Sequence, residues 1–224
     1  MIREGLLSLE ELDITPEKAY AAMGYGGNVP EAEVRGVVDD ILRQVTEYAK
    51  PSFIFRIVPA TVPEKGLVCM GGRPFRVGGI IGSYLPGMDE ACVFVATAGN
   101  EYDRYLSTLK IKGDILSEYV ADAIGSVIAE ACVDYVDRML EDVSSKQHSL
   151  PYSPGYCAWN IKEQRILFPL LPPNPCGVTL SDSCLMSPVK SVSGFFALGD
   201  KLVKQPYKCD ICTNKMCYKR RLRK

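Results

Sequence analysis

The chain has 224 residues, of which 47% are hydrophobic and 24% are charged, and its formal net charge is -1. This composition excludes an intrinsically disordered protein, and the balanced charge gives no general attraction to nucleic acid or to a membrane surface. No run reaches the ~18 apolar residues of a membrane span, and acids among the first eleven residues do not fit a secretory signal, so we expect a cytoplasmic protein.

The first half of the chain contains one clear helix and several strand patterns. Apolar residues recur at helical spacing between Pro30 and Pro51, which predicts a helix that begins and ends near these prolines. A strand is expected over residues 52–60. The glycines of residues 65–83 predict short extended pieces joined by turns, and residues 91–99 are typical of a buried strand.

The second half is expected to contain a long helix, a shorter helix and two short strands. Residues 114–143 carry apolar side chains at helical spacing, which predicts one long helix. Asn160 is expected to cap a helix that ends at residue 171, before two prolines. Short strands are expected over residues 177–183 and 191–198. Because the strands cluster and do not alternate regularly with helices, the sequence predicts an α+β fold and not a doubly wound parallel sheet.

The last residues differ in character from the rest. Residues 1–204 are expected to form one α+β domain, and residues 205–224 a basic tail that contains cysteines. Cys209, Cys212 and Cys217 have a Cys-x2-Cys-x4-Cys spacing that can converge on one zinc ion or iron-sulfur cluster, although both normally take four protein ligands. The candidates for a fourth ligand are Cys157, Cys176, Cys184 and His148. The alternative is a tail of free, reactive thiols.

Residues 153–156, Ser-Pro-Gly-Tyr, have the pattern of a tight turn, because proline fixes φ and glycine permits backbone angles that other residues avoid. Such a backbone can approach a ligand closely, and Tyr156 would add a ring face and a hydroxyl group. A Pro-Gly pair taken alone is more often only a turn. Nearby, the polar stretch around His148 predicts an exposed loop histidine. Cys157, beside the turn, is either a contact of the ligand site or a packed thiol.

Several blocks follow this turn in a fixed order. They are a helix with Gln164 and Leu170-Leu171, then Gly177-Val178-Thr179-Leu180, Met186-Ser187-Pro188 and Ser191-Val192-Ser193-Gly194. Their order and spacing resemble the activation domain of cobalamin-dependent methionine synthase, over about residues 80–194. The resemblance implies an α+β fold with a twisted antiparallel sheet and long helices.

The resemblance also implies a role in repair. When the cob(I)alamin of methionine synthase is oxidised to cob(II)alamin, the activation domain binds S-adenosylmethionine and presents its methyl group while a reductant supplies an electron. Since no corrin-binding, homocysteine or folate module is recognisable, we expect a stand-alone activation subunit. Its partners would be a cobalamin-binding methionine synthase or other corrinoid protein, and an electron donor such as flavodoxin or ferredoxin. The chain would be at most the reactivation component of this methyltransferase.

The family's ligand-binding positions can be matched to this chain. Gly155, Tyr156 and the backbone of Ser153 match the loop that holds S-adenosylmethionine, and Glu130 matches an acid on the long helix that contacts it. The chain departs from the family at Pro151, where the family has an arginine that contacts the ligand. Proline has neither a charge nor a donor.

Pro151 leaves two interpretations open. In the first, S-adenosylmethionine binds as the resemblance implies, and another group, such as Lys190, His148 or a residue of the partner, replaces the arginine of the family. In the second, the chain is a corrinoid-protein accessory without S-adenosylmethionine chemistry, and its cysteine tail binds metal or relays electrons.

Overall fold

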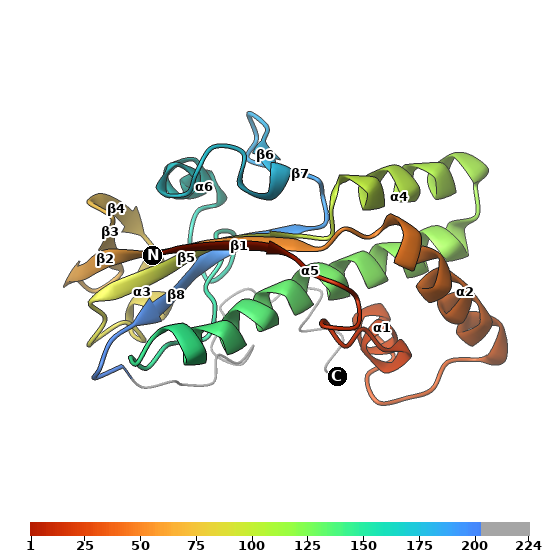
Figure 1. Ribbon diagram of the computed structural model, residues 1–224, viewed down its shortest axis with the longest axis horizontal. Coiled ribbons are helices and arrows are strands. Elements are labelled where there is room, and N and C mark those ends of the chain that lie inside the picture. Colours follow the sequence, from red (N-terminus) through yellow and green to blue (C-terminus); the bar gives the residue numbers. More distant parts are fainter. Residues whose placement is uncertain (203–224) are drawn as a thin grey trace.

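The computed structural model describes residues 1–202, and its centre is a six-stranded sheet with the order β4-β3-β2-β5-β8 and with β1 beside β2 (Figure 1). All neighbouring strands of this sheet run antiparallel. The strands are β1 (Ile2–Leu6), β2 (Ser52–Glu64), β3 (Leu67–Met70), β4 (Arg73–Arg76), β5 (Glu90–Thr97) and β8 (Ser191–Leu198). A separate pair is formed by β6 (Thr179–Leu180) and β7 (Met186–Ser187).

The helices fall into two groups by length. The longer ones are α1 (Pro16–Met23), α2 (Ala32–Tyr48), α4 (Asn100–Lys112) and α5 (Ile115–Val143). The short ones are α3 (Gly78–Gly82), α6 (Gln164–Leu167) and the 3-10 turns η1 (Ile161–Glu163), η2 (Phe168–Leu170) and η3 (Pro175–Gly177). Helices and strands therefore combine in an α+β fold with an antiparallel sheet, as predicted.

The two faces of the sheet bury different sets of side chains. Along β5, Phe94 points into one hydrophobic cluster and the adjacent Val93 and Val95 point into the other, as the alternation of a strand requires. The longer helices pack on the first face, whereas α3 and the segment from residue 152 to residue 178 cover the second. In Figure 1, α5 and α6 lie on opposite sides of the sheet.

Helix α5 is the longest element and spans the first face. The Asp114 side chain caps its start by accepting a hydrogen bond from the Ser117 backbone N–H at 3.0 Å. Its 29 residues extend over about 44 Å at about 1.5 Å per residue. A Cβ atom at Gly125 would lie 2.5 Å from Tyr102 of α4, so the glycine permits the close approach of the two helices. The long helix predicted over residues 114–143 is confirmed.

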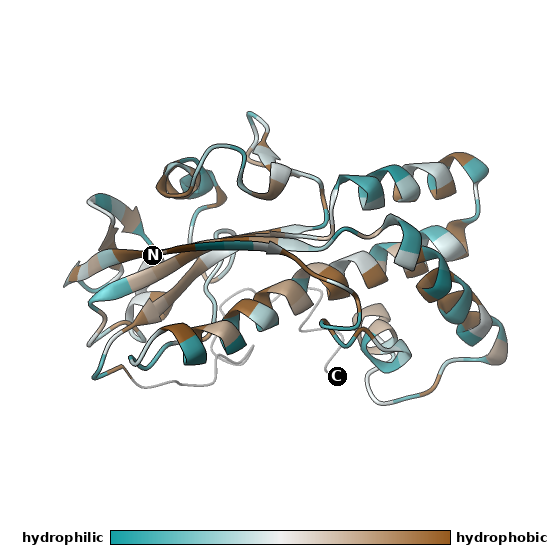
Figure 2. Cartoon of the chain, viewed as in Figure 1, coloured by the Kyte–Doolittle hydropathy of each residue, from teal (hydrophilic) through white to brown (hydrophobic). Residues whose placement is uncertain are grey.

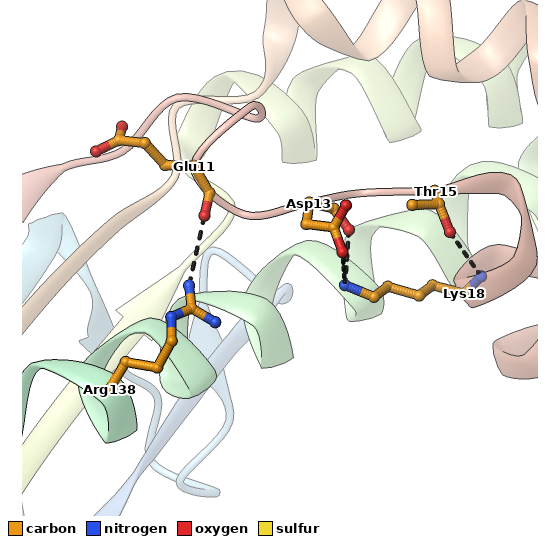
Figure 3. A network of polar contacts seen from close by, with 5 residues as sticks. All are labelled: Glu11, Asp13, Thr15, Lys18 and Arg138. Carbon is orange, nitrogen blue, oxygen red and sulfur yellow. Dashed lines mark hydrogen bonds and ion pairs between the residues drawn. The ribbon is translucent and has the colours of Figure 1, made fainter. Parts of the chain in front are cut away.

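The amino-terminal segment is tied to α5 by polar contacts (Figure 3). Arg138 of α5 donates a hydrogen bond of 3.4 Å to the carbonyl oxygen of Glu11. Lys18 of α1 pairs with the Asp13 carboxylate at 3.0 Å, and Thr15 caps the start of α1. These contacts hold α1 beside α5, where Ala19 and Met23 join the first hydrophobic cluster.

The helix near Pro30 and the strands expected over residues 52–60, 91–99 and 191–198 are confirmed with small shifts of their ends. Figure 2 shows the hydrophobic and hydrophilic positions that alternate along α2. That alternation is why a single face of α2 is buried. Among residues 1–202, no helix has both the length and the apolar composition that crossing a bilayer requires.

Two predictions about the second half were wrong. The expected helix from Asn160 to residue 171 is three short pieces, η1, α6 and η2, because Pro169 has no N–H to continue an α-helix. The Asn160 cap itself is confirmed, since its Oδ1 accepts from the Lys162 N–H at 2.9 Å. The strand expected over residues 177–183 is reduced to the two residues of β6. Helix α4 and the elements before residue 30 were not predicted.

Candidate functional site

A pocket of about 240 Å³ lies between α5 and the segment that contains the Ser-Pro-Gly-Tyr turn. Its lining comes from α3, from α5, from residues 151–156 and from β8. The lining residues are Ile81, Glu130, Val133, Asp134, Pro151, Tyr152, Ser153, Tyr156 and Val192. The pocket is mainly apolar, with two carboxylates on the helix side and a tyrosine on the opposite side.

The turn is built mainly from hydrogen bonds within its own backbone. The Tyr156 N–H donates to the Ser153 carbonyl at 3.3 Å, and the Gly155 N–H donates to the Trp159 carbonyl at 2.8 Å. Gly155 has a φ of 94°, in the left-handed region that glycine adopts without strain. Tyr156 is 47% exposed and lines the pocket, so its side chain is accessible to a ligand.

Trp159 anchors the far end of the turn in the core. Its ring is 1% exposed and packs edge-on against Phe75 and Phe195. Its Nε1–H donates to the Glu163 carboxylate at 2.6 Å, and the same carboxylate accepts from the Arg76 backbone N–H at 3.0 Å. A buried indole N–H needs such a partner, so this end of the turn is fixed to both η1 and β4.

The near end of the turn is anchored on strand β8. Tyr152 and Phe195 exchange two backbone hydrogen bonds, each of 2.9 Å. A Cβ atom at Gly194 would lie only 2.1 Å from the Tyr152 carbonyl oxygen. The glycine that ends the Ser-Val-Ser-Gly block is therefore needed to let residues 152–153 lie against the strand.

The helix side of the pocket carries Glu130 and Asp134, which lie one turn apart and share a face of α5. Partial burial raises the pKa of Asp134 above its usual value, and the carboxylates of Glu130 and Asp137 raise it further, against smaller opposite effects of Arg138 and Lys18. Sequence reasoning missed Asp134. The available signal was its spacing of four residues from Glu130 on a predicted helix.

The structure brings together three of the four residues matched to the family's ligand site. Glu130, Ser153 and Tyr156 line the same pocket, whereas Gly155 lies in the turn between them and shapes its backbone. Pro151 also lines the pocket, at the place where the family has its arginine. Roles in ligand binding remain predictions for all of these residues.

His148 was expected to be exposed, and this prediction was wrong. The side chain is buried, with its Nε2 2.8 Å from the Asp137 carboxylate of α5 and its ring edge-on to Phe196. Lys190 is also buried, and its Nζ lies 2.7 Å from the Asp122 carboxylate. Neither residue is among the described residues that line the pocket.

Four of the six cysteines in the described part of the chain are buried, and Cys69 and Cys176 are partly buried. Cys157 is 5% exposed and is not among the residues that line the pocket, which favours the packed thiol of the two alternatives. Burial raises the pKa of Cys132 to about 12. Within residues 1–202, no group of three or more His, Cys, Asp or Glu side chains is placed to hold a metal ion. The predicted ligands Cys209, Cys212 and Cys217 lie outside the described residues.

Comparisons with known proteins agree with this geometry. A family described as "Vitamin B12 dependent methionine synthase, activation domain" matches residues 85–204, which is more than half of the chain. No curated protein matches. Among solved structures, "Crystal Structure of the MetH Reactivation Domain bound to AdoHcy" superposes with a TM-score of 0.68 at 15% identity, covering 93% of this chain and 80% of that chain. The matched residues include the turn and β8, and the chain belongs to the family of activation domains of vitamin B12-dependent methionine synthases.

Proposed function

We propose that this chain is a stand-alone activation subunit that binds S-adenosylmethionine and supports the reductive remethylation of cob(II)alamin on a partner protein. The observation that carries the proposal is the convergence of Glu130, Ser153 and Tyr156 on one pocket between α5 and the turn. The proposal includes residues 1–204 as the functional domain and a location in the cytoplasm. The solved neighbour is, by its title, bound to AdoHcy, the demethylated form of the proposed ligand.

The four residues matched to the family's ligand site can each make a contact suited to this ligand. The Tyr156 ring offers a flat face for the purine, and its hydroxyl offers a donor. The Glu130 carboxylate can hold the amino group or the positive sulfur. The backbone of Ser153 and Gly155 can approach the ligand closely, because glycine has no side chain. The partner's cobalamin supplies the metal that accepts the methyl group. A flavodoxin or ferredoxin would supply the electron.

A titration of S-adenosylmethionine into the full chain, alone and with the cobalamin partner, tests the proposal. We expect Glu130→Gln to weaken binding about tenfold or more, because a charge-assisted contact contributes about 1.5–3 kcal/mol. Glu141→Gln is the matched control, since Glu141 is an exposed acid near the end of the same helix and is not in the pocket lining. Absence of binding with the partner and a reductant present would overturn the proposal.

Pro151 predicts weak binding by the isolated chain. Replacing it with arginine adds the charged donor that the family has at this place, so we expect Pro151→Arg to tighten S-adenosylmethionine binding about ten- to a hundredfold. Pro151→Ala removes the proline without adding a charge and should give no such gain. If both variants bind like the unmodified chain, position 151 does not contact the ligand.

The second candidate function rests on the spacing of Cys209, Cys212 and Cys217. In this case the chain is a corrinoid-protein accessory that uses a metal or an iron-sulfur cluster, and S-adenosylmethionine has no part in it. Anaerobic purification and elemental analysis separate the options: zinc would indicate a structural site, and iron with labile sulfide an electron relay. This candidate is excluded if neither metal is present and Cys209→Ser leaves stability and reactivation unchanged.

A further inference from the structure

The charged side chains among the described residues that line the pocket are all acidic. Two carboxylates, Glu130 and Asp134, line it from α5, and none of the described lining residues is a lysine, arginine or histidine. At the position where the family has an arginine, the chain has Pro151, which also adds no charge. The described walls therefore favour a ligand with positive charge at the place that faces the helix.

The two basic side chains whose charges act on Asp134, Lys18 and Arg138, have other hydrogen-bond partners (Figure 3). Lys18 of α1 donates to Asp13, both to its carboxylate at 3.0 Å and to its carbonyl oxygen at 2.7 Å. Arg138 donates to the Glu11 carbonyl, and its guanidinium lies 5.7 Å from the centre of the Tyr135 ring.

The next acid along the helix, Asp137, also has a partner. Asp137 pairs with His148 at 2.8 Å. Within residues 1–202, no lysine, arginine or histidine forms an ion pair with Asp134. The charge of this carboxylate is thus not cancelled by a described neighbour.

Methyl transfer changes the charge of the ligand at its sulfur. In S-adenosylmethionine the sulfur is a sulfonium cation. When the S–CH3 bond breaks, its electron pair stays on sulfur, and the methyl group forms a Co–C bond with the electron pair of the Co(I) centre, which the one-electron donor has generated from Co(II). The product that remains is a neutral thioether. A carboxylate that faces the sulfur attracts the reactant and not the product.

We propose that Asp134 makes the pocket selective for a sulfonium ligand over the neutral thioether left after methyl transfer. This inference rests on the proposed function and deepens it, because it assigns to Asp134 a role in specificity. Loss of the positive charge weakens the binding of the product. The product is then more readily exchanged for a new methyl donor after each reactivation.

Competition binding to the full chain, with the cobalamin partner present, tests the inference with three probes. They are S-adenosylmethionine, S-adenosylhomocysteine and sinefungin, which has a protonated amine in place of the methylated sulfur. We expect the two cationic probes to bind about tenfold or more tightly than S-adenosylhomocysteine. At the position of the sulfonium, sinefungin carries a positive charge but no methyl group. It therefore separates the effect of charge from contact with the methyl group.

Substitutions on α5 assign the selectivity to a residue. We expect Asp134→Asn to reduce the preference for the cationic probes to about two- to threefold while retaining S-adenosylhomocysteine binding. Asp142→Asn removes the same charge from an exposed position about 12 Å further along the helix, at about 1.5 Å per residue, and should leave the preference unchanged.

The outcomes distinguish this inference from the proposed function. Equal binding of all three probes by the unmodified chain overturns the inference and leaves the proposed function standing, as does a preference that Asp134→Asn does not reduce. Absence of binding of every probe overturns both. The comparison on the unmodified chain needs no variant, so it can overturn the inference even if Asp134→Asn does not fold.

Discussion

Gly194 shows how one small residue fixes the position of the ligand loop. Any side chain there would meet the Tyr152 carbonyl oxygen, at 2.1 Å from the added Cβ atom. Either the loop or β8 must then move, and the two backbone hydrogen bonds between Tyr152 and Phe195 would be strained. The glycine at the end of the Ser-Val-Ser-Gly block is thus required for steric reasons, which could not be predicted from the sequence alone.

We expect Gly194→Ala to lower the free energy of unfolding by about 1–3 kcal/mol, the usual cost of overpacking. The measurement is urea denaturation followed by circular dichroism. Gly36→Ala is the control, because Gly36 is an exposed position of α2 with open space around its Cβ, and should stabilise the protein by about 0.5–1 kcal/mol. Equal effects of the two substitutions would contradict the steric argument.

The carboxylate proposed to give ligand selectivity, Asp134, also lowers the stability of the folded protein. Its pKa is higher in the folded protein than the usual carboxyl value, so its ionisation opposes folding. This cost is absent where the carboxyl is protonated in both states, below a pH of about 4, and increases as the pH rises through the folded value. Ionised Asp134 thus destabilises the fold at neutral and alkaline pH.

We therefore expect Asp134→Asn to raise the urea midpoint at pH 7 and to have a smaller effect at pH 3.5. Denaturation curves at both pH values test this, with Asp142→Asn as the control that should change neither. A midpoint for Asp134→Asn that falls at pH 7 would show that the carboxylate stabilises the fold.

At the scale of elements, α5 and the segment before the turn are coupled by a buried pair. His148 lies in an irregular extension of the sheet, bridged to Leu198, and its Nε2 contacts Asp137 of α5. Asp137 follows Asp134 by less than one helical turn. The pair thus connects the segment before the turn to α5 close to the helix wall of the pocket.

We expect His148→Ala to lower the free energy of unfolding by about 1–3 kcal/mol, since it removes a buried hydrogen-bond partner. S-adenosylmethionine binding should weaken as well, because the loop is no longer held against α5. Calorimetry and denaturation on the same samples measure both effects. Asp142→Ala serves as the surface control and should change stability by less than about 0.5 kcal/mol. An unchanged affinity would mean that the loop keeps its position without this pair.

Elements with strong periodicity could be predicted from the sequence, and others could not. Helix α5 and the central strands have dense apolar patterns, whereas α4 buries only Tyr102, Tyr105 and Leu109 among many charged residues. The position of His148 depends on a partner on a neighbouring element, so its polar sequence neighbours were misleading. The convergence of Glu130 with the turn was accessible only through the family resemblance, because residues about twenty-five apart meet by tertiary packing.

At the scale of the whole molecule, the family match and the cysteine-containing tail fall on different parts of the sequence. The match ends at residue 204, and the cysteines of the tail lie beyond it. We expect a chain shortened to residues 1–204 to unfold cooperatively, with a urea midpoint close to that of the full chain, and to retain S-adenosylmethionine binding. If its midpoint falls well below that of the full chain, residues 205–224 contribute to the domain.

The pairing of residues 147–152 with β8 also bears on how the protein avoids self-association. Backbone hydrogen bonds from Ser149 to Ala197 and from Gly199 to Gln147 occupy the outer side of this strand, beside those of Tyr152. Without this segment, β8 would present a row of unpaired N–H and C=O groups along an apolar strand, and such an edge readily pairs with another chain. A protease cut within this segment would therefore promote aggregation as well as the loss of ligand binding.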